Sequence, residues 1–333
     1  MRITFAFPPL LFLLCVWSVV ACSYRQPSRA DVQPGASLTP GAVSPGVARD
    51  GTASPTPGEP PSLRKEGCEV RSSPGPGGPV TDPRGPYYHR VAIAHTPDGI
   101  HLSGATVVLE HASVPDGVKR ADGSVLIYYV NGTDHGVFVA RVEGDTAVPI
   151  GPITLDGVSK PGGVVDPDAT LLPSGTIRLA YMSGFGPGGG AGGWTMCLAD
   201  STDGVNFTVI GQALRFTDAT STDPSIVQLA NGDWLMAVSQ GQNTVLAKSA
   251  DGLRYEVYAT VGYGGVPEIN VLPGGWLRLY VCAAGGLGTY ISKDNGATWQ
   301  YETAIANPIA GSKLFCDPSV VTGTDLFVFK VGE

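Results

Sequence analysis

Charged side chains are scarce in this sequence, and basic ones are not in excess. Asp, Glu, Lys and Arg make up 15% of the 333 residues, well below the usual share of about a quarter. The 29 acidic residues outnumber the 21 basic ones and give a formal net charge of −8. A protein that holds nucleic acid or an anionic membrane surface by charge needs a basic patch, so the composition argues against both partners.

Metal-binding motifs are also missing. No Cys-x-x-Cys pair occurs, and no cysteine lies among the five histidines, which all fall between residues 89 and 135, whereas zinc sites use closely spaced Cys and His ligands. The sequence therefore predicts no metal centre and no cofactor. It leaves open whether a cation such as calcium binds among the acidic residues described below.

Glycine and proline, in contrast, are abundant, with 46 and 28 residues. This is the composition of many short strands joined by tight turns. Five proline motifs recur at intervals of 43 to 57 residues, each followed by alternating apolar residues and a turn signal. The motifs are Val114-Pro115-Asp116, Asp166-Pro167-Asp168, Asp223-Pro224-Ser225, Val266-Pro267-Glu268 and Asp317-Pro318-Ser319. A repeat of this length that is built only of strands predicts the blades of a β-propeller.

The last repeat sets the number of blades. After Asp317 the chain has room for only two strands before Glu333, and a matching outer pair is found at 87–94 and 100–110. Pairing these N-terminal strands with the C-terminal ones removes the exposed edge that an open ring would leave. We predict an all-β, five-bladed β-propeller over residues 67–333, with the last blade closed by N-terminal strands.

The chain before the propeller has a different character. Residues 1–22 combine a cationic start, an apolar stretch and small residues before Cys22, which resembles a bacterial lipoprotein signal peptide. Residues 23–66 are rich in proline and poor in large apolar side chains, so we predict a disordered linker. We expect a protein of the bacterial cell envelope, lipid-anchored through Cys22 and facing the periplasm or the exterior. An ordinary secretory signal or a membrane anchor is the alternative.

The remaining cysteines can form disulfides in an exported protein. They are Cys68, Cys197, Cys282 and Cys316. The propeller layout puts Cys282 and Cys316 on the same face of adjacent blades, which favours that pair. The connectivity cannot otherwise be read from sequence.

A second motif marks the turns between outer strands. Residues 292–299 match Ser-x-Asp-x-Gly-x-x-Trp and resemble the Asp box, or BNR repeat, of sialidases and other β-propellers. Shorter versions occur at 96–102, 201–207 and 249–255. The Asp and Ser side chains bond to backbone groups of the turn, and Gly adopts a positive φ. We therefore expect these motifs to be structural.

One face of the predicted propeller gathers carboxylates, because the inner strand of every blade begins there. The six residues are Asp116, Asp166, Asp168, Asp223, Glu268 and Asp317. Loops at the ends of the second strands add His135, Trp194 and Gln240 to the rim. Crowded carboxylates repel one another, so some pKa values rise while others stay low, which divides acid from base roles. Glycoside hydrolysis needs such a pair.

This arrangement resembles glycoside hydrolase family 43 and related propeller glycosidases, in which a base Asp, an orienting Asp and an acid Glu come from successive blades. The resemblance implies that Asp166 activates water, Asp223 orients and tunes the acid, and Glu268 protonates the leaving oxygen. The other carboxylates, Asp116, Asp168 and Asp317, would bind substrate together with His135, Trp194 and Gln240. The first blade departs from the family, because Val114-Pro115-Asp116 stands where the trio would begin.

The sequence therefore predicts a monomer that is directed to a carbohydrate or cell-surface glycan and hydrolyses glycosides with its carboxylates. A non-catalytic propeller that binds a glycan or a protein is the alternative, because Asp beside Pro also caps turns at strand starts. Whether the protein is an enzyme is thus left open. A sialidase is the third interpretation, but sialidases have six blades and an arginine triad, and no Arg-Ile-Pro motif occurs near the first strands.

Overall fold

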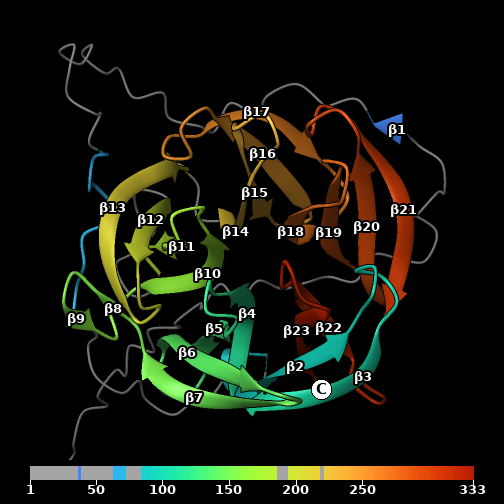
Figure 1. The fold of residues 1–333 in the computed structure, drawn as a ribbon, viewed down its shortest axis with the longest axis horizontal. Helices are drawn as coiled ribbons and strands as arrows, with labels where there is room; N and C mark the ends of the chain where they lie inside the picture. Colours follow the sequence, from blue (N-terminus) through green and yellow to red (C-terminus); the bar gives the residue numbers. More distant parts are fainter. Residues whose placement is uncertain (1–36, 39–62, 73–83, 186–193, 218–220) are drawn as a thin grey trace, which may run out of the picture.

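A ring of five β-sheets surrounds a central axis (Figure 1). The computed structural model describes residues 37–38, 63–72, 84–185, 194–217 and 221–333. The signal-like residues 1–22 with Cys22, and most of the predicted linker, lie outside these ranges. In the described part of the chain no helix is long and apolar enough to cross a bilayer.

Each blade is an antiparallel meander whose first strand lies next to the axis. Blade 1 consists of β4 (Ala112–Lys119), β5 (Val125–Asn131), β6 (Gly136–Glu143) and β7 (Thr146–Pro152). Blade 2 consists of β10 (Val164–Leu171), β11 (Ile177–Ser183), β12 (Thr195–Ser201) and β13 (Asn206–Arg215). Blade 3 consists of β14 (Ser221–Gln228), β15 (Trp234–Gln240), β16 (Asn243–Ser249) and β17 (Glu256–Val261). Blade 4 consists of β18 (Gly265–Val271), β19 (Leu277–Ala283), β20 (Gly286–Ser292) and β21 (Trp299–Ala306).

Blade 5 is shared between the two ends of the folded chain, as predicted. It consists of β22 (Leu314–Val320), β23 (Leu326–Gly332), β2 (His89–His95) and β3 (Ser103–Glu110). The β2 and β23 strands pair along their whole length, from His89 opposite Gly332 to His95 opposite Leu326. Figure 1 shows these C-terminal and N-terminal strands side by side. The all-β fold, the five blades and the closing pair are therefore confirmed.

Short elements extend the blade edges. β8 (Thr154–Leu155) pairs in parallel with β13 and antiparallel with β9 (Val158–Ser159). β1 (Ser37–Leu38) pairs with β21, and a 3₁₀ turn, η1 (Pro86–Tyr88), precedes β2. These additions cover the outermost strands of blades 2 and 4, where unpaired backbone groups would otherwise be exposed.

The same backbone irregularity occurs at the start of every inner strand. The pairing of the first two strands shifts register at each proline motif, which is the signature of a β-bulge. The residue before each proline has a left-handed φ: Val114 46°, Asp166 53°, Asp223 50°, Val266 52° and Asp317 48°. Such a conformation is unfavourable for a β-branched side chain. In blades 1, 2 and 4 the residues before and after the proline both line the axial pocket, and in blades 3 and 5 the residue before the proline does.

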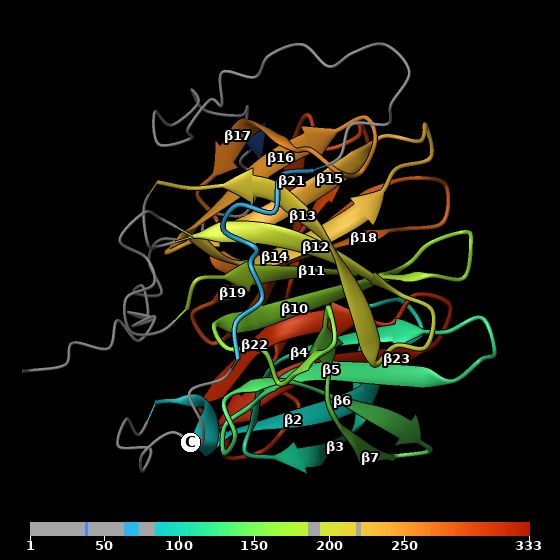
Figure 2. The same ribbon diagram turned by 90° about the vertical axis from the view of Figure 1, so that its left-hand side faces the viewer.

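Two disulfides lie in the described part of the chain. Cys282 of β19 is bonded to Cys316 of β22, which confirms the predicted pair. Cys68 is bonded to Cys197 of β12, a pairing that the sequence left open. The second bond holds residues 63–72 against the outside of blade 2, where the Gln212 amide donates to the Arg64 carbonyl (2.8 Å). Figure 2 shows this light-blue segment crossing blade 2.

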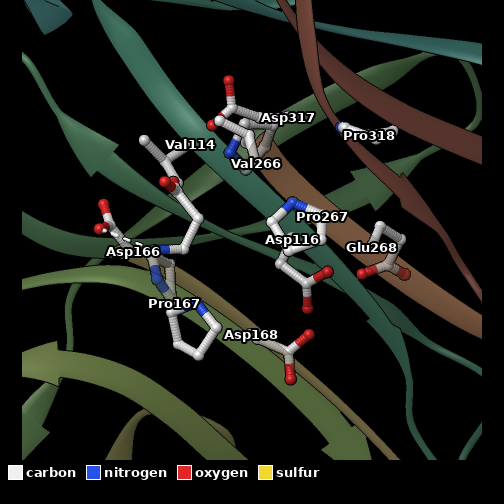
Figure 3. A pocket seen from close by; sticks show the side chains of 13 residues that line it. Val114, Asp116, Asp166, Pro167, Asp168, Val266, Pro267, Glu268, Asp317 and Pro318 are labelled. Carbon is white, nitrogen blue, oxygen red and sulfur yellow. Dashed lines mark hydrogen bonds between the residues drawn. The ribbon is translucent and has the colours of Figure 1, made fainter. Parts of the chain in front are cut away.

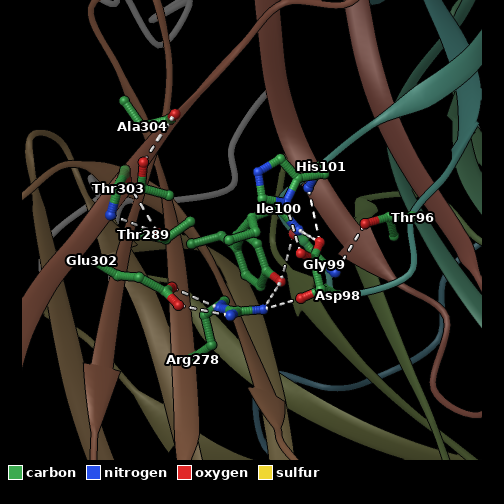
Figure 4. A network of polar contacts seen from close by, with 11 residues as sticks. Thr96, Asp98, Gly99, Ile100, His101, Arg278, Thr289, Glu302, Thr303 and Ala304 are labelled. Atoms are coloured by element: carbon green, nitrogen blue, oxygen red, sulfur yellow. Dashed lines mark hydrogen bonds and ion pairs between the residues drawn. The ribbon is translucent and has the colours of Figure 1, made fainter.

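A buried arginine joins blade 4 to blade 5 (Figure 4). Arg278 of β19 donates two 2.7 Å hydrogen bonds to Glu302 of β21 and a third to the carbonyl of Asp98, in the β2–β3 turn. The hydroxyl of Tyr280 donates to the Gly99 carbonyl of the same turn (3.0 Å). A Cβ at Gly99, where φ is 80°, would lie 2.5 Å from the Tyr280 hydroxyl, so this close approach requires glycine.

The Ser-x-Asp turns are held by their own side chains. In the turn after β20, Asp294 accepts hydrogen bonds from the Thr298 amide (2.8 Å), the Thr298 hydroxyl (2.6 Å) and the Ser292 hydroxyl (2.8 Å). Equivalent bonds form at Asp203 and Asp251. The turn after β20 leads directly into Trp299, whose side chain is fully buried.

Replacing Asp294 by alanine is expected to lower the free energy of unfolding by about 1–3 kcal/mol, because three hydrogen bonds of about 1 kcal/mol each are lost. Urea unfolding monitored by tryptophan fluorescence measures the change. The control is Glu256→Ala, which removes an exposed carboxylate on β17. Equal stability of the two variants would contradict a holding role for this turn.

Candidate active site

The residues that flank the five prolines of the inner strands form two rings around the axis, and eight of them line one pocket together with the prolines (Figure 3). We call the residues before the prolines the outer ring: Val114, Asp166, Asp223, Val266 and Asp317. We call the residues after the prolines the inner ring: Asp116, Asp168, Ser225, Glu268 and Ser319. The structure thus brings all six predicted carboxylates into one pocket.

The inner ring is a closed cycle of hydrogen bonds between blades. Each side chain accepts the backbone N–H that follows the inner-ring residue of the next blade. The donors are Ala169 for Asp116 (2.6 Å), Ile226 for Asp168 (3.1 Å), Ile269 for Ser225 (3.1 Å), Val320 for Glu268, and Gly117 for Ser319 (3.0 Å). An oxygen acceptor is therefore useful in every blade, so the inner ring has a structural role.

Three inner-ring carboxylates also face one another. One oxygen from each of Asp116, Asp168 and Glu268 lies within 4.8 Å of the other two, and the residues are 6–7% exposed. Burial raises the pKa of Asp116 to about 6. Burial, and then the charge of Asp116, raises the pKa of Asp168 and of Glu268 well above their ordinary values. Hydrogen-bond donors such as Ser225 and Asn270 partly offset these shifts.

The outer ring contains three carboxylates and lies next to a lysine. Lys330 of β23 forms an ion pair with Asp317, and their side chains are 12% and 3% exposed. The Asp223 amide donates to Asp166 Oδ2 (3.2 Å), and the Thr222 hydroxyl donates to Asp223 Oδ2 (2.5 Å). These contacts connect Asp166, Asp223 and their backbone across blades 2 and 3.

Burial and like charges raise the pKa values of Asp166 and Asp223 unequally. Burial, followed by the charges of Asp223 and Asp317, raises the pKa of Asp166 well above its ordinary value. Burial and the charge of Asp317 raise the pKa of Asp223 to about 6. Burial lowers the pKa of Lys330, but the neighbouring carboxylates outweigh it and raise this pKa. Burial and like charges thus raise the pKa of Asp166 further than that of Asp223, so Asp166 is the later of the two to lose its proton as pH rises.

Solvent reaches the two rings unequally. The inner ring is buried in every blade, whereas Val114, Asp223 and Val266 of the outer ring are only half-buried. The cavity that the rings line has a volume of about 30 Å³, enough for a water-sized molecule but far less than the roughly 300 Å³ or more of a ligand pocket. A ligand larger than this cavity would therefore contact the outer ring from the open face.

The three predicted rim residues lie in the loops or strand ends of that face. His135 is exposed in the turn between β5 and β6, and Gln240 ends β15. Trp194 precedes β12 and packs, partly buried, against the hydrophobic cluster between blades 2 and 3. Phe185 lies beside Trp194 at this rim: it is 47% exposed, and its ring centroid lies 6.4 Å from that of Trp194. Substrate binding by His135, Trp194 and Gln240 remains a prediction.

The structure divides the predicted catalytic trio. Asp166 and Asp223 are neighbours in the outer ring. Glu268 lies in the inner ring, where it accepts hydrogen bonds from the Ser225 hydroxyl (2.8 Å) and the Asn270 amide (3.2 Å). The two aspartates and the glutamate therefore occupy different environments.

Sequence reasoning missed two basic residues near the outer ring. Lys330 is the single charged residue in the otherwise apolar β23. This interruption of the apolar pattern was the only feature of the sequence that could have indicated a role for it. His89 begins β2 and its Nδ1 lies 2.8 Å from the Ser113 hydroxyl. Burial and the charge of Lys330 lower the pKa of His89 to about 3, so this imidazole is neutral near pH 7.

The raised carboxylate pKa values predict a characteristic pH dependence of stability. Asp223 has a pKa of about 6 in the folded protein and an ordinary value of 3.8. Between these values the folded state holds the proton more tightly than the unfolded chain, so this group lowers stability as pH rises. From pH 4 to pH 7, the free energy of unfolding of Asp223→Asn is expected to rise by about 1–3 kcal/mol relative to that of the wild type. Urea unfolding at both pH values measures this, and a constant difference would contradict it.

Comparison with known proteins is informative at the level of the fold. No protein-family model matches the sequence, and no curated protein is similar to it. Among solved structures, an N-acetylgalactosamine deacetylase from F. plautii, in complex with blood group B trisaccharide, superposes with a TM-score of 0.53 at 15% identity. The match covers 70% of this chain and 81% of that one.

Two further structures are similar over most of their length. A protein of unknown function from Dyadobacter fermentans DSM 18053 gives a TM-score of 0.51 at 14% identity, covering 77% of this chain and 86% of that one. A thermostable family-43 glycoside hydrolase gives 0.50 at 11% identity, covering 68% and 89%. At these sequence identities, the three matches show that this chain shares the fold of the three solved structures.

Proposed function

We propose that the protein is a carbohydrate-active propeller that hydrolyses glycosides with the carboxylates of the outer ring. The observation that carries this proposal is the pair Asp166 and Asp223. They are adjacent at the mouth of the axial pocket, and burial and like charges give them unequal pKa values. A protonated acid beside an ionised carboxylate is what acid–base cleavage of a glycoside requires.

The structural neighbours support carbohydrate as the class of ligand. One shares the fold and is a deacetylase of N-acetylgalactosamine with a bound trisaccharide, and another is a family-43 glycoside hydrolase. A fold hosts many functions, so the pocket and not the similarity decides the chemistry.

The electrostatics favour a division of roles different from the one that the family resemblance implies. Asp166, buried and protonated, would donate its proton to the glycosidic oxygen as the bond to the leaving group breaks. Asp223, half-buried and ionised, would take a proton from the water that attacks the anomeric carbon. Glu268 lies below them in the inner ring and makes structural hydrogen bonds. We therefore assign the proton donor to Asp166 in place of Glu268.

The cellular location of the protein is part of the same proposal. The lipoprotein-like signal and Cys22 favour export and lipid anchoring at the bacterial cell envelope. A linker of about 40 residues would then let the propeller reach glycans at some distance from the membrane. Mass spectrometry of the membrane fraction, comparing the wild type with Cys22→Ala, tests for the lipid.

A non-catalytic glycan-binding propeller is the second candidate. The inner-ring hydrogen bonds favour it, because they give Asp116, Asp168 and Glu268 a structural purpose. A sialidase is less well supported: the chain has five blades, and none of the residues lining the pocket is an arginine.

Incubation of the purified full chain with a panel of aryl glycosides and cell-wall polysaccharides separates these candidates. Release of sugar, detected by reducing ends and chromatography, is the expected result. Glycan binding on an array without turnover on any substrate would favour the binding module. If the protein shows no glycan binding and no turnover, a carbohydrate ligand is contradicted.

A further inference from the structure

The inner ring contains three buried carboxyl groups, and none of the described residues that donate hydrogen bonds to them does so with a basic side chain. Lys330 is paired with Asp317 in the outer ring. Asp116, Asp168 and Glu268 face one another across the axis (Figure 3). Their hydrogen-bond donors are hydroxyl, amide and backbone groups, which stabilise a carboxylate without neutralising it.

The spacing of the three carboxylates fits a single cation. One oxygen from each lies within 4.8 Å of the others. Oxygen ligands lie about 2.3–2.6 Å from calcium, so two ligands on opposite sides of the ion are about 4.6–5.2 Å apart. Three oxygens at the observed spacing can therefore contact one ion without a change in the backbone. The axial cavity, about 30 Å³ in volume, has room for an ion and a water.

Asn270 supplies a second, independent observation. It follows Glu268 by two residues on β18, so both side chains lie on the same face of the strand. Its amide nitrogen donates to Glu268 Oε1 (3.2 Å) and to the Val320 carbonyl (3.5 Å). The residue is 7% exposed, and its amide oxygen has no hydrogen-bond partner. A buried carbonyl oxygen without a donor is costly, and beside carboxylates it is a ligand suited to a hard cation.

We propose that the inner ring binds one divalent cation of the calcium class through Asp116, Asp168 and Glu268, with the Asn270 amide oxygen beside them. The ion joins β4, β10 and β18 at the axis and offsets the cost of burying three ionised carboxylates together. This proposal goes beyond glycoside hydrolysis and does not depend on it. All of its ligands are oxygens, which favours Ca²⁺ over Zn²⁺.

Calorimetric titration of the purified full-length protein with CaCl₂, after dialysis against EDTA and then buffer, tests the proposal. We expect one Ca²⁺ to bind per chain and the thermal unfolding midpoint to rise with Ca²⁺ concentration. Asp168→Asn keeps the shape of the side chain and can still accept the Ile226 amide. It is expected to weaken Ca²⁺ binding at least tenfold while the circular dichroism spectrum stays unchanged.

The matched control is Asp223→Asn, which removes an outer-ring carboxylate of the same pocket and is expected to leave Ca²⁺ affinity within about threefold of the wild type. Glu268→Gln provides a second test should Asp168→Asn fail to fold, with the same tenfold loss expected. The proposal is overturned by a wild-type protein that binds no Ca²⁺ at millimolar concentration. It is equally overturned by a loss of affinity in Asp223→Asn as large as that in the inner-ring variants.

Discussion

Replacing Asp166 by asparagine is expected to lower kcat for glycoside hydrolysis by about 10²–10⁴-fold, the usual contribution of a positioned acid. Asparagine has nearly the same size and can still accept the Asp223 amide, so the local geometry should persist. What it lacks is the proton that burial and the charges of Asp223 and Asp317 hold on Asp166. Steady-state kinetics on a substrate identified in the glycoside panel measures the effect.

Two readouts separate an acid from a residue that merely supports the fold. Aryl glycosides whose leaving group departs without a proton, such as dinitrophenyl glycosides, should lose much less activity in Asp166→Asn than nitrophenyl or natural ones. In the wild type, kcat should rise with pH near pH 6, where Asp223 ionises. At higher pH it should fall again, because Asp166 then loses the proton that it donates. Only the second limb should disappear in the variant.

Glu268→Gln is the matched comparison, because the family resemblance implies that Glu268 is the acid. A leaving-group-dependent loss in Glu268→Gln, with near-normal activity in Asp166→Asn, would restore that assignment and contradict ours. A loss that does not depend on the leaving group would indicate a structural effect on the pocket.

The fold was predictable because it repeats. Five proline motifs at similar spacing indicated five inner strands, and the short last repeat indicated that β2 and β3 complete blade 5. The same layout put Cys282 beside Cys316. The Cys68–Cys197 bond was not predictable, since it depends on how residues 63–72 cross blade 2.

The sequence was enough to predict which carboxylates belong to the pocket, but not how they are arranged within it. Alternation along a strand suggests that residues two apart share a face, and it indicates correctly that Asp166 and Asp168 both belong to the pocket. It gives no sign of the bulge at each proline, which separates them into an outer and an inner ring. Because that division sets burial and partners, the roles of Asp166 and Glu268 could not be read from sequence.

Lys330 was missed for a related reason. In sequence it is one lysine in the apolar strand β23. Antiparallel pairing of β22 and β23 puts it opposite Cys316 and beside Asp317, so that contact depends on the register of one hairpin. The charges of Asp223 and Asp166 reach it from blades 3 and 2, and no local spacing links these residues to Lys330. Contacts between blades are therefore the part of the site that needs a structure.

The ion pair of Lys330 leads to the largest stability effect that we expect. Lys330→Met is expected to lower the free energy of unfolding by about 3–5 kcal/mol near pH 7.5, the usual cost of leaving a buried charge without its partner. The methionine fills a similar volume, so the loss reports charge rather than packing. Chemical unfolding measures it, with the exposed Lys313→Met as the control, for which a change within about 0.5 kcal/mol is expected.

The pH dependence identifies the cause of that loss. Without Lys330, the pKa values of Asp166 and Asp223 rise further in the folded protein, while those of the unfolded chain do not change. The folded state then holds protons that the unfolded chain releases, so the stability of Lys330→Met should fall more steeply than that of the wild type as pH rises above about 4. The penalty should be smaller near pH 4.5, where the raised pKa values keep Asp166 and Asp223 protonated, and Lys330→Met/Asp317→Asn should recover much of it at pH 7.5. A penalty that is the same at both pH values, or that Asp317→Asn does not relieve, would show that Lys330 stabilises the propeller by packing and not by its charge.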